Sequence, residues 1–268
     1  MGKTAAVISE VKNSGKSVFT YILANHIREM VTQDTKILVC CLNSKFSLLY
    51  KLMGINESSP GIEEFINLQE SGCENKARAL EDLIPKSNGI YFLGSYKTTN
   101  SYVNRNIDGF STLVDSLEKT FDLIIFDTVS SKENTLTNIV FEKSSMLINL
   151  FVQDAESVNK LNLVGDKMIH KRKEMYLISK YRDIYPRVSD IKRRFSLDKL
   201  YKMDYCKTLQ EMKNRDSLHL YLQRDTECNH SVRLISKYIT QVFNLDIKGK
   251  KQEDKRVNYL KSIFDILT

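Results

Sequence analysis

The chain has 268 residues, of which 42% are hydrophobic and 27% are charged, and only three are prolines. This composition supplies a full hydrophobic core, most simply in one large domain, and excludes long disordered linkers. No apolar run approaches the ~20 residues that span a membrane, and the N-terminal stretch lacks a signal-peptide core, so we expect a cytoplasmic protein. The formal net charge of +7 favours an anionic partner, whether nucleic acid, acidic lipid or nucleotide.

The cysteines and histidines predict neither a disulfide framework nor a zinc site. The five cysteines are odd in number and lack C-x-x-C spacing, and the four histidines form no ligand pair. We therefore expect reduced thiols, and any metal is expected to be Mg²⁺ held together with a nucleotide.

The first predicted elements are a strand at Ala5–Ile8 and a helix, joined by a polar turn that ends in Gly15, Lys16 and Ser17. After the turn, apolar residues recur at helical spacing over residues 19–30. In such a turn, backbone N–H groups and the positive end of the helix dipole converge on one point, where a phosphate binds. Lys16 would reach the β- and γ-phosphates, and the Ser17 hydroxyl would be a ligand for Mg²⁺.

The phosphate-loop pattern is incomplete in this chain. The full pattern G-x-x-x-x-G-K-S/T requires glycine where the chain has Glu10. A carboxylate beside the phosphates would repel them unless it turns outward. The alternative interpretation is an ordinary helix start with Ser17 in its first turn.

Strands and helices alternate through the middle of the chain. The strand predicted at residues 36–42 is an unbroken apolar run, as expected for a parallel strand covered on both faces, and it ends at Asn43. Residues 95–108 are polar and aromatic and are expected to form a surface loop. The other elements predicted before residue 121 are helices at 46–53, 60–66, 77–83 and 110–120 and a strand at 89–94.

A buried strand that presents a carboxylate is predicted at Phe121–Thr128, where four apolar residues run into Asp127. The carboxyl ends of parallel strands form the ligand edge of a doubly wound sheet. Asp127 is therefore placed to hold the Mg²⁺ shell, in the way that a Walker-B aspartate does. A strand that ends in aspartate can also be a simple turn.

Strands at Met146–Val152 and Met175–Ile178 continue the alternation, which predicts an α/β fold: a doubly wound, mostly parallel sheet flanked by helices in a single domain. Residues 186–223 have weaker periodicity, whereas Ser231–Phe243 is an amphipathic helix. We divide the chain into an α/β domain at 1–246, a basic linker at 247–256 and a short helix at 257–268.

The last predicted helix carries an apolar stripe between basic flanks, within Val257–Leu267. Such a helix can lie in the interface of a bilayer, where buried apolar area and attraction to acidic lipid add. It can equally dock on its own domain or on a partner.

In the order of its elements, the chain resembles the MinD/ParA class of P-loop ATPases, which includes the TadZ/CpaE-like proteins of pilus loci. FDLIIFD at 121–127 resembles the family's FDxIIxD strand, and NYLKSIF at 258–264 is similar to the membrane-targeting GFLKRLF of MinD. Further likenesses lie at residues 10–17, 61–66, 153–157 and 209–215. The resemblance implies the P-loop NTPase fold, ATP or ADP with Mg²⁺ as ligands, and a homodimer.

The resemblance also implies which residues form the site. Ser17 and Asp127 would hold Mg²⁺, and the candidate catalytic residues are Lys16, Asn43, Asp127 and Lys12. The candidate nucleotide contacts are the loop residues Asn13, Ser14, Gly15, Lys16, Ser17 and Val18, together with Ser179 and Lys180 near the adenine and Asn214 in a late segment of the chain.

Two departures from the family pattern bear on catalysis. The family's loop, K-G-G-x-G-K-S/T, begins with a lysine that reaches the partner's nucleotide; here Val11 has that position and Lys12 lies one place later. The family's second strand ends in D-x-D, whose latter aspartate helps to orient the attacking water; here the positions are Cys41 and Asn43. An amide cannot accept a proton as a carboxylate can, so we expect slow or absent hydrolysis.

These features predict a dimerising, ATP-binding factor that positions proteins of a pilus, secretion or division apparatus. It would be peripheral at the inner face of the cell membrane, attached to acidic lipid through Val257–Leu267. One alternative is a degenerate pseudo-ATPase that serves as a scaffold for protein contacts. Another is a partition protein that binds DNA without sequence preference, which would make binding strongly dependent on salt.

Overall fold

The computed structural model describes residues 3–43, 48–55, 59–70, 76–95, 99–130, 134–161 and 173–249. The predicted helix at Val257–Leu267 and most of the predicted linker lie outside these residues. The start of that linker belongs to the folded part, because Ile247 forms a β-bridge with Val31 and the Lys248 N–H donates to the Met30 carbonyl oxygen at 2.9 Å.

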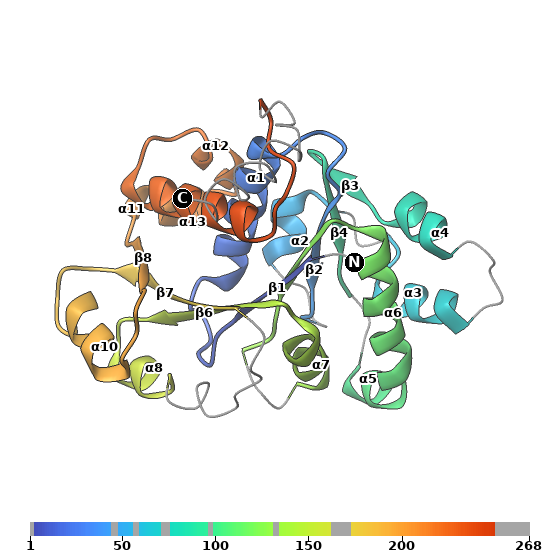
Figure 1. Ribbon diagram of the computed structural model, residues 1–268, viewed down its shortest axis with the longest axis horizontal. Helices are drawn as coiled ribbons and strands as arrows, with labels where there is room; N and C mark the ends of the chain where they lie inside the picture. The colour runs from blue at the N-terminus through green and yellow to red at the C-terminus, as the bar shows by residue number, and fades with distance from the viewer. Residues whose placement is uncertain are drawn as a thin grey trace, which may run out of the picture.

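An eight-stranded sheet forms the centre of the molecule, in the order β3-β4-β2-β5-β1-β6-β7-β8 (Figure 1). Every neighbouring pair is parallel except β3 and β4. The predicted α/β class with a mostly parallel sheet is therefore confirmed. The strands are β1 (Lys3–Ile8), β2 (Ile37–Cys41), β3 (Lys86–Ser87), β4 (Ile90–Leu93), β5 (Leu123–Asp127), β6 (Met146–Val152), β7 (Lys173–Tyr181) and β8 (Tyr201–Asp204).

Helices cover both faces of the sheet because successive strand side chains point to opposite sides. On β1, Ala5 and Val7 pack with α1, α2, α12 and α13, whereas Ala6 and Ile8 pack with α3, α4, α6 and α7. Helices α8 and α10 extend the second layer under β6 and β7. The helices are α1 (Lys16–Met30), α2 (Leu48–Met53), α3 (Ile62–Glu70), α4 (Lys76–Leu83), α5 (Asn100–Arg105), α6 (Ile107–Thr120), α7 (Thr135–Lys143), α8 (Ala155–Asn159), α10 (Val188–Phe195), α11 (Lys207–Asn214), α12 (Leu218–Tyr221) and α13 (Glu227–Val242).

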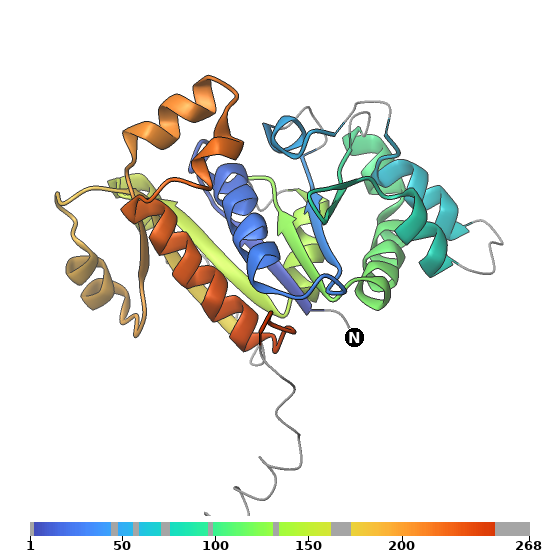
Figure 2. The same cartoon turned by 90° about the horizontal axis from the view of Figure 1, so that it is seen from above.

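Helix α1, which begins at the phosphate loop, is fixed to α13, and Figure 2 shows the two helices side by side. The contact includes a buried polar pair: His26 Nε2 lies 2.6 Å from Asn229 Oδ1. The Asn229 amide also donates to the carbonyl oxygens of Leu222 at 3.0 Å and Arg224 at 2.8 Å. One asparagine therefore ties α13 both to α1 and to the turn that follows α12.

Two regions differ from the sequence prediction. The expected surface loop at 95–108 contains α5, which lies against α6 and α7. Thr99 Oγ1 accepts from the Tyr102 N–H at 3.2 Å and Tyr102 Oη donates to Asn67 Oδ1 at 3.2 Å, so side-chain hydrogen bonds rather than apolar periodicity define this helix. The weakly periodic region after residue 186 contains α10, the edge strand β8 and α11.

Within the residues that the structure describes, no helix has both the length and the apolar character needed to cross a bilayer.

Candidate functional site

The loop between β1 and α1 is shaped by two residues with positive φ. Gly15 has φ 95° and immediately precedes α1, and Asn13 has φ 58°. A side chain at Gly15 would be strained by this backbone conformation although no atom lies within 4 Å of the space it would occupy. The loop thus leaves open space at the N-terminus of a helix of 15 residues, where the backbone N–H groups are unpaired and the helix dipole is positive.

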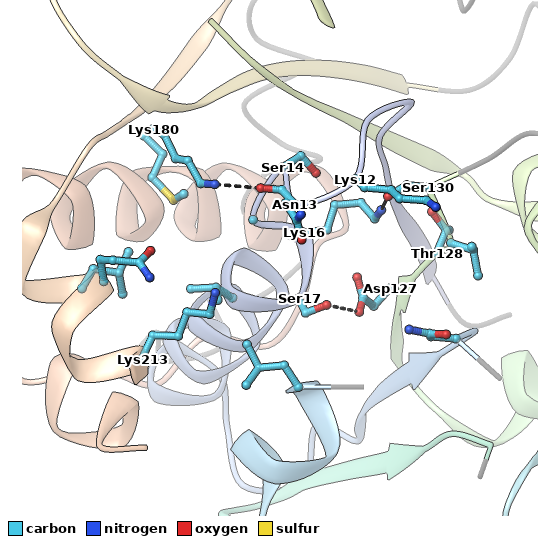
Figure 3. A pocket seen from close by; sticks show the side chains of 18 of the residues that line it. Lys12, Asn13, Ser14, Lys16, Ser17, Asp127, Thr128, Ser130, Lys180 and Lys213 are labelled. Atoms are coloured by element: carbon cyan, nitrogen blue, oxygen red, sulfur yellow. Dashed lines mark hydrogen bonds between the residues drawn. The ribbon is translucent and has the colours of Figure 1, made fainter. Parts of the chain in front are cut away.

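The first two residues of α1 join this loop to the end of β5 (Figure 3). The Ser17 hydroxyl donates to Asp127 Oδ2 at 2.7 Å, and the Lys16 ammonium donates to the Ser130 hydroxyl. Parallel pairing explains why these groups meet: Val7 on β1 lies beside Asp127 on β5, so both strands end at the same edge. The sequence prediction that Lys16 and Asp127 would face one cleft agrees with this placement.

Asp127 is a buried carboxylate that is only partly satisfied. Its side chain is 3% exposed, and Oδ1 has no hydrogen-bond partner among the described residues. Burial raises the pKa of Asp127, while the charge of Lys16 and the hydrogen bond from Ser17 act to lower it. Burial likewise lowers the pKa of Lys16, and the charge of Asp127 opposes that shift.

These groups fit a magnesium–nucleotide ligand. An oxygen without a partner, next to a serine hydroxyl, is suited to a hydrated Mg²⁺, and Lys16 with the loop N–H groups is suited to phosphate oxygens. Among the described residues, no group of three or more His, Cys, Asp or Glu could hold a metal by itself. A metal at this position would therefore need ligands from the nucleotide and from water.

A cleft of about 1220 Å³ opens at this edge of the sheet, which is ample for a small-molecule ligand. We call the part formed by residues 12–18 and 127–130 the loop end. The far end is formed by β8, α11 and the end of β7. Its lining residues are Lys180, Met203, Asp204, Tyr205, Cys206, Leu209, Gln210 and Lys213.

The cleft has two further properties. Four lysines line it, Lys12, Lys16, Lys180 and Lys213, which favours an anionic ligand. Uncharged polar side chains line another part of the wall; these are Asn43, Asn104, Asn134 and Thr135.

Glu10, the residue that breaks the loop pattern, does not line this cleft. It lines a separate small cavity together with Lys160. A hydrogen bond to Glu156 raises the pKa of Lys160, and the charge of Glu10 adds to this shift. Glu10 thus lies outside the cleft lining and close to the cation of Lys160, although its charge also acts to raise the pKa of Lys16. Of the two residues that follow it, Lys12 lines the cleft and Val11 is not among the lining residues.

The end of β2 supplies no carboxylate to the cleft. Cys41 is fully buried, and its Sγ lies 3.9 Å from Asp127 Oδ2. Asn43 lines the cleft, and the Leu42 N–H between them donates to the Asp127 carbonyl oxygen at 2.9 Å. An amide therefore stands where the resemblance leads us to look for a water-orienting group.

The structure separates Asn214 from the other two late residues that were predicted as nucleotide contacts, Ser179 and Lys180. Ser179 is buried and donates to the Ser14 carbonyl oxygen, and the Lys180 ammonium donates to the Asn13 carbonyl oxygen at 2.7 Å. Both therefore hold the phosphate loop, and Lys180 also lines the cleft. Asn214 is exposed at the end of α11, accepts from Gln210 Nε2 at 3.0 Å, and is not among the lining residues.

Sequence reasoning missed most of the far end and Ser130. Met203, Tyr205 and Cys206 belong to or follow β8, a strand of four residues whose pattern was too short to recognise. On α11, the side that faces the cleft carries Gln210 and Lys213, whereas the prediction expected Asn214 there. Ser130 could have been predicted from its position, because it follows Asp127 by three residues and so lies at the same edge of the sheet.

Comparison with known proteins identifies the fold. No protein-family model and no curated protein matches the chain. A ParA family ATPase from Chlorobium tepidum is 15% identical, with a TM-score of 0.73 over 89% of this chain and 98% of that one. The septum site-determining protein MinD from Pyrococcus horikoshii, solved with Mg-ADP, is 12% identical, with a TM-score of 0.70 over 90% of this chain and 97% of that one.

A plasmid partition protein from Borrelia burgdorferi, solved with AMPPNP, is 17% identical, with a TM-score of 0.65 over 90% of this chain and 99% of that one. The chain therefore has the single-domain P-loop fold of the ParA and MinD ATPases, and the resemblance seen in the sequence is confirmed as a likeness of fold.

Proposed function

We propose that this chain is a MinD/ParA-class protein that binds ATP or ADP with Mg²⁺ and hydrolyses ATP slowly. The observation that carries the proposal is the convergence of Lys16, Ser17 and Asp127 on one cleft at the start of α1. The Mg-ADP and AMPPNP complexes of proteins with the same fold support it.

Each residue of the loop end has a proposed role. The N–H groups of residues 13–18 bind phosphate oxygens, and Lys16 neutralises their charge. Ser17 and Asp127 orient Mg²⁺, which when bound neutralises charge that develops on the phosphates. Ser130 exchanges its hydrogen bond with Lys16 for one with the ligand or with water.

Slow turnover follows from the residues around the position of the attacking water. Asn43 can orient a water molecule but cannot accept its proton. Lys12 stands on the cleft with its side chain exposed, and we propose that it contacts the nucleotide of a second protomer in a dimer. Lys12→Ala should therefore reduce dimerisation in ATP more than it reduces nucleotide affinity.

The biological role that we propose is the positioning of another protein at a membrane, in a pilus, secretion or division apparatus. A solved MinC:MinD complex from Aquifex aeolicus shows that a protein with this fold binds a partner. Attachment to acidic lipid would use Val257–Leu267. Vesicle flotation of the full chain against a version that ends at Gly249 tests this attachment, and equal flotation of both would remove the tail from the proposal.

Calorimetry with Mg-ATP and Mg-ADP, followed by a turnover assay, tests the central claim. We expect micromolar binding, about 100-fold weaker binding by Lys16→Ala, and slow phosphate release. Lys160→Ala is the matched control, because Lys160 is a lysine outside the cleft. Unchanged affinity and unchanged dimer population in Lys16→Ala would rule out nucleotide binding through Lys16 and its control of dimerisation.

A second candidate function is a scaffold that has lost nucleotide binding, which the Cys41 and Asn43 positions favour. Absence of any heat of binding with either nucleotide would support it and exclude the leading proposal. A third, DNA partition, is favoured by the basic surface at residues 180–215. It requires binding to duplex DNA that weakens steeply with salt, independently of sequence.

A further inference from the structure

The connection between β7 and α10 lies at the left extremity of the molecule in Figure 1 and carries two exposed apolar side chains, which we call the tip. Ile184 is 54% exposed and Tyr185 is 83% exposed. Among the described residues, these are the only two exposed large apolar side chains that are adjacent in sequence. The others, Leu83, Ile107, Tyr205, Leu220 and Leu234, stand singly.

The tip is held in place by one side chain. Gln153 Nε2 donates to the carbonyl oxygens of Ile184 at 2.7 Å and Pro186 at 2.8 Å, and Gln153 Oε1 accepts from the Arg182 N–H at 3.0 Å. These hydrogen bonds satisfy the backbone of the turn on its inner side, so the two apolar side chains are presented outward by a fixed backbone. A projecting pair that is organised in advance loses little conformational entropy when it binds.

The part of the sequence that contains the tip is basic. Residues 180–215 contain eleven Lys and Arg against five Asp and Glu, which accounts for +6 of the chain's formal charge of +7. Arg182 lies over the Tyr205 ring at 4.3 Å, and Arg187 pairs with Asp183 at 3.3 Å. Arg193 and Arg194 are exposed in the last turn of α10, where Arg193 lies 3.4 Å from Asp190 Oδ1 and Arg194 donates to Asn159 Oδ1 at 2.7 Å.

We propose that this tip, Ile184 and Tyr185 with the basic residues of α10, is a contact site for an anionic lipid surface. An apolar and an aromatic side chain can enter the interface of a bilayer while neighbouring guanidinium groups bind lipid phosphates. Duplex DNA would use the basic residues but would leave Ile184 and Tyr185 in water. A convex tip also suits a deformable surface better than a preformed pocket on a protein.

This inference deepens the membrane role proposed above and adds a contact on the folded domain, distinct from Val257–Leu267. Two contacts on one chain make binding stronger than either alone, because the second contact forms at a high effective concentration. Binding through the tip would also fix how the domain faces the membrane. The far end of the cleft would lie toward the lipid surface, because Lys180, two residues before Arg182, lines the cleft.

The test uses the absence of tryptophan from the chain. In full-length Tyr185→Trp, the new indole is the only tryptophan and reports on the tip alone. The matched control is Leu234→Trp on α13, where Leu234 is 53% exposed. With Mg-ATP and phosphatidylcholine vesicles that contain phosphatidylglycerol, we expect a blue shift of the Tyr185→Trp emission and quenching by brominated lipid, and neither change in Leu234→Trp.

A second pair of variants tests the two parts of the site. Ile184→Ser should weaken vesicle binding about tenfold through lost apolar burial. The double change Arg193→Glu and Arg194→Glu should weaken it further and remove the preference for phosphatidylglycerol over pure phosphatidylcholine.

The outcomes separate this inference from the proposed function. Flotation of the chain without any change in Tyr185→Trp emission would overturn the tip and leave membrane attachment intact. An emission change with duplex DNA or with no anionic lipid present would also overturn it. Failure to float at all would remove both membrane proposals, while nucleotide binding would still be decided by calorimetry.

Discussion

The loop end and the far end of the cleft are built from different kinds of structure. The loop end lies where the central strands β1 and β5 finish, and its buried side chains Lys16 and Asp127 are fixed by neighbours on both faces of the sheet. The far end is attached to β8, the edge strand, and several of its side chains are exposed. The buried centre of the sheet can hold charged side chains in one fixed arrangement, whereas the edge leaves its side chains free to adapt to a ligand.

The largest expected effect is therefore at Asp127. Asp127→Asn keeps the shape of the side chain but removes its charge, so Mg²⁺ loses a ligand partner and buried Lys16 loses its counter-charge. We expect Mg²⁺-dependent nucleotide affinity to fall about 100-fold. Calorimetry with and without Mg²⁺ measures this.

Asp204→Asn is the control, because Asp204 is an aspartate at the far end of the same cleft. We expect it to bind Mg-ADP almost as the unaltered chain does. Equal losses of nucleotide affinity in the two variants would show that the loop end is no more important for binding Mg²⁺ than the far end.

Helix α13 packs against both α1 and β8 and so connects the two ends. Asn229→Ala removes the partner of His26 Nε2 and of two backbone carbonyl oxygens in a buried site. Leaving these groups unsatisfied should lower the free energy of unfolding by about 1–3 kcal/mol, measured by urea denaturation. Asn214→Ala changes an exposed asparagine and should leave stability within about 0.5 kcal/mol.

The loop end was predictable from sequence because its signals are local and consistent. Gly15, Lys16 and Ser17 follow an apolar strand directly, and Asp127 ends another, so parallel pairing brings them together without further information. The short hairpin between β3 and β4 was not predicted, although the Asn88-Gly89 pair is a local signal for it; both residues have positive φ, as its two-residue turn requires.

The far end was not predictable for a physical reason. An edge strand of four residues is paired on one side only, so β8 needs no long apolar run, and α11 has no buried residues to give it a clear period. Tertiary contacts decide both elements. The placement of Asn214 outside the cleft lining follows from this, because the two partly buried apolar side chains of α11 that pack on the core, Leu209 and Met212, are too few to fix its rotation from sequence.

The pH dependence of binding sharpens the contrast between the ends. Burial raises the pKa of Asp127 above the ordinary 3.8, and Mg²⁺ requires the charged carboxylate, so metal binding releases a proton. Mg²⁺-dependent affinity should thus fall as the pH drops through the raised pKa of Asp127, when it is measured from about pH 8 down to about pH 4. In the nucleotide-free chain the sign is opposite, because the protonated carboxyl is the form that the buried site favours, and its contribution to stability decreases as the pH rises.

Thermal melts across this pH range measure both effects. Melts without Mg-ADP give the pH dependence of stability, and the increase in melting temperature with Mg-ADP gives the pH dependence of binding. Asp127→Asn has no titrating carboxyl at this position and is the control. A stabilisation by Mg-ADP that is the same in the two chains at every pH would contradict the assignment of the proton to Asp127.

The smallest expected effect is at the far end. Lys213→Ala removes one cation from the cleft wall, where Lys180 carries a second, and should weaken ADP binding about threefold. Cys206 lines the same wall and is partly exposed, whereas Cys40, Cys41 and Cys228 are buried. A nucleotide whose base lies at the far end should therefore slow alkylation of Cys206 by N-ethylmaleimide, followed by mass spectrometry of its peptide. Slowing by Mg-ADP but not by pyrophosphate would place the base there, and equal rates with and without Mg-ADP would show that the base lies elsewhere in the cleft.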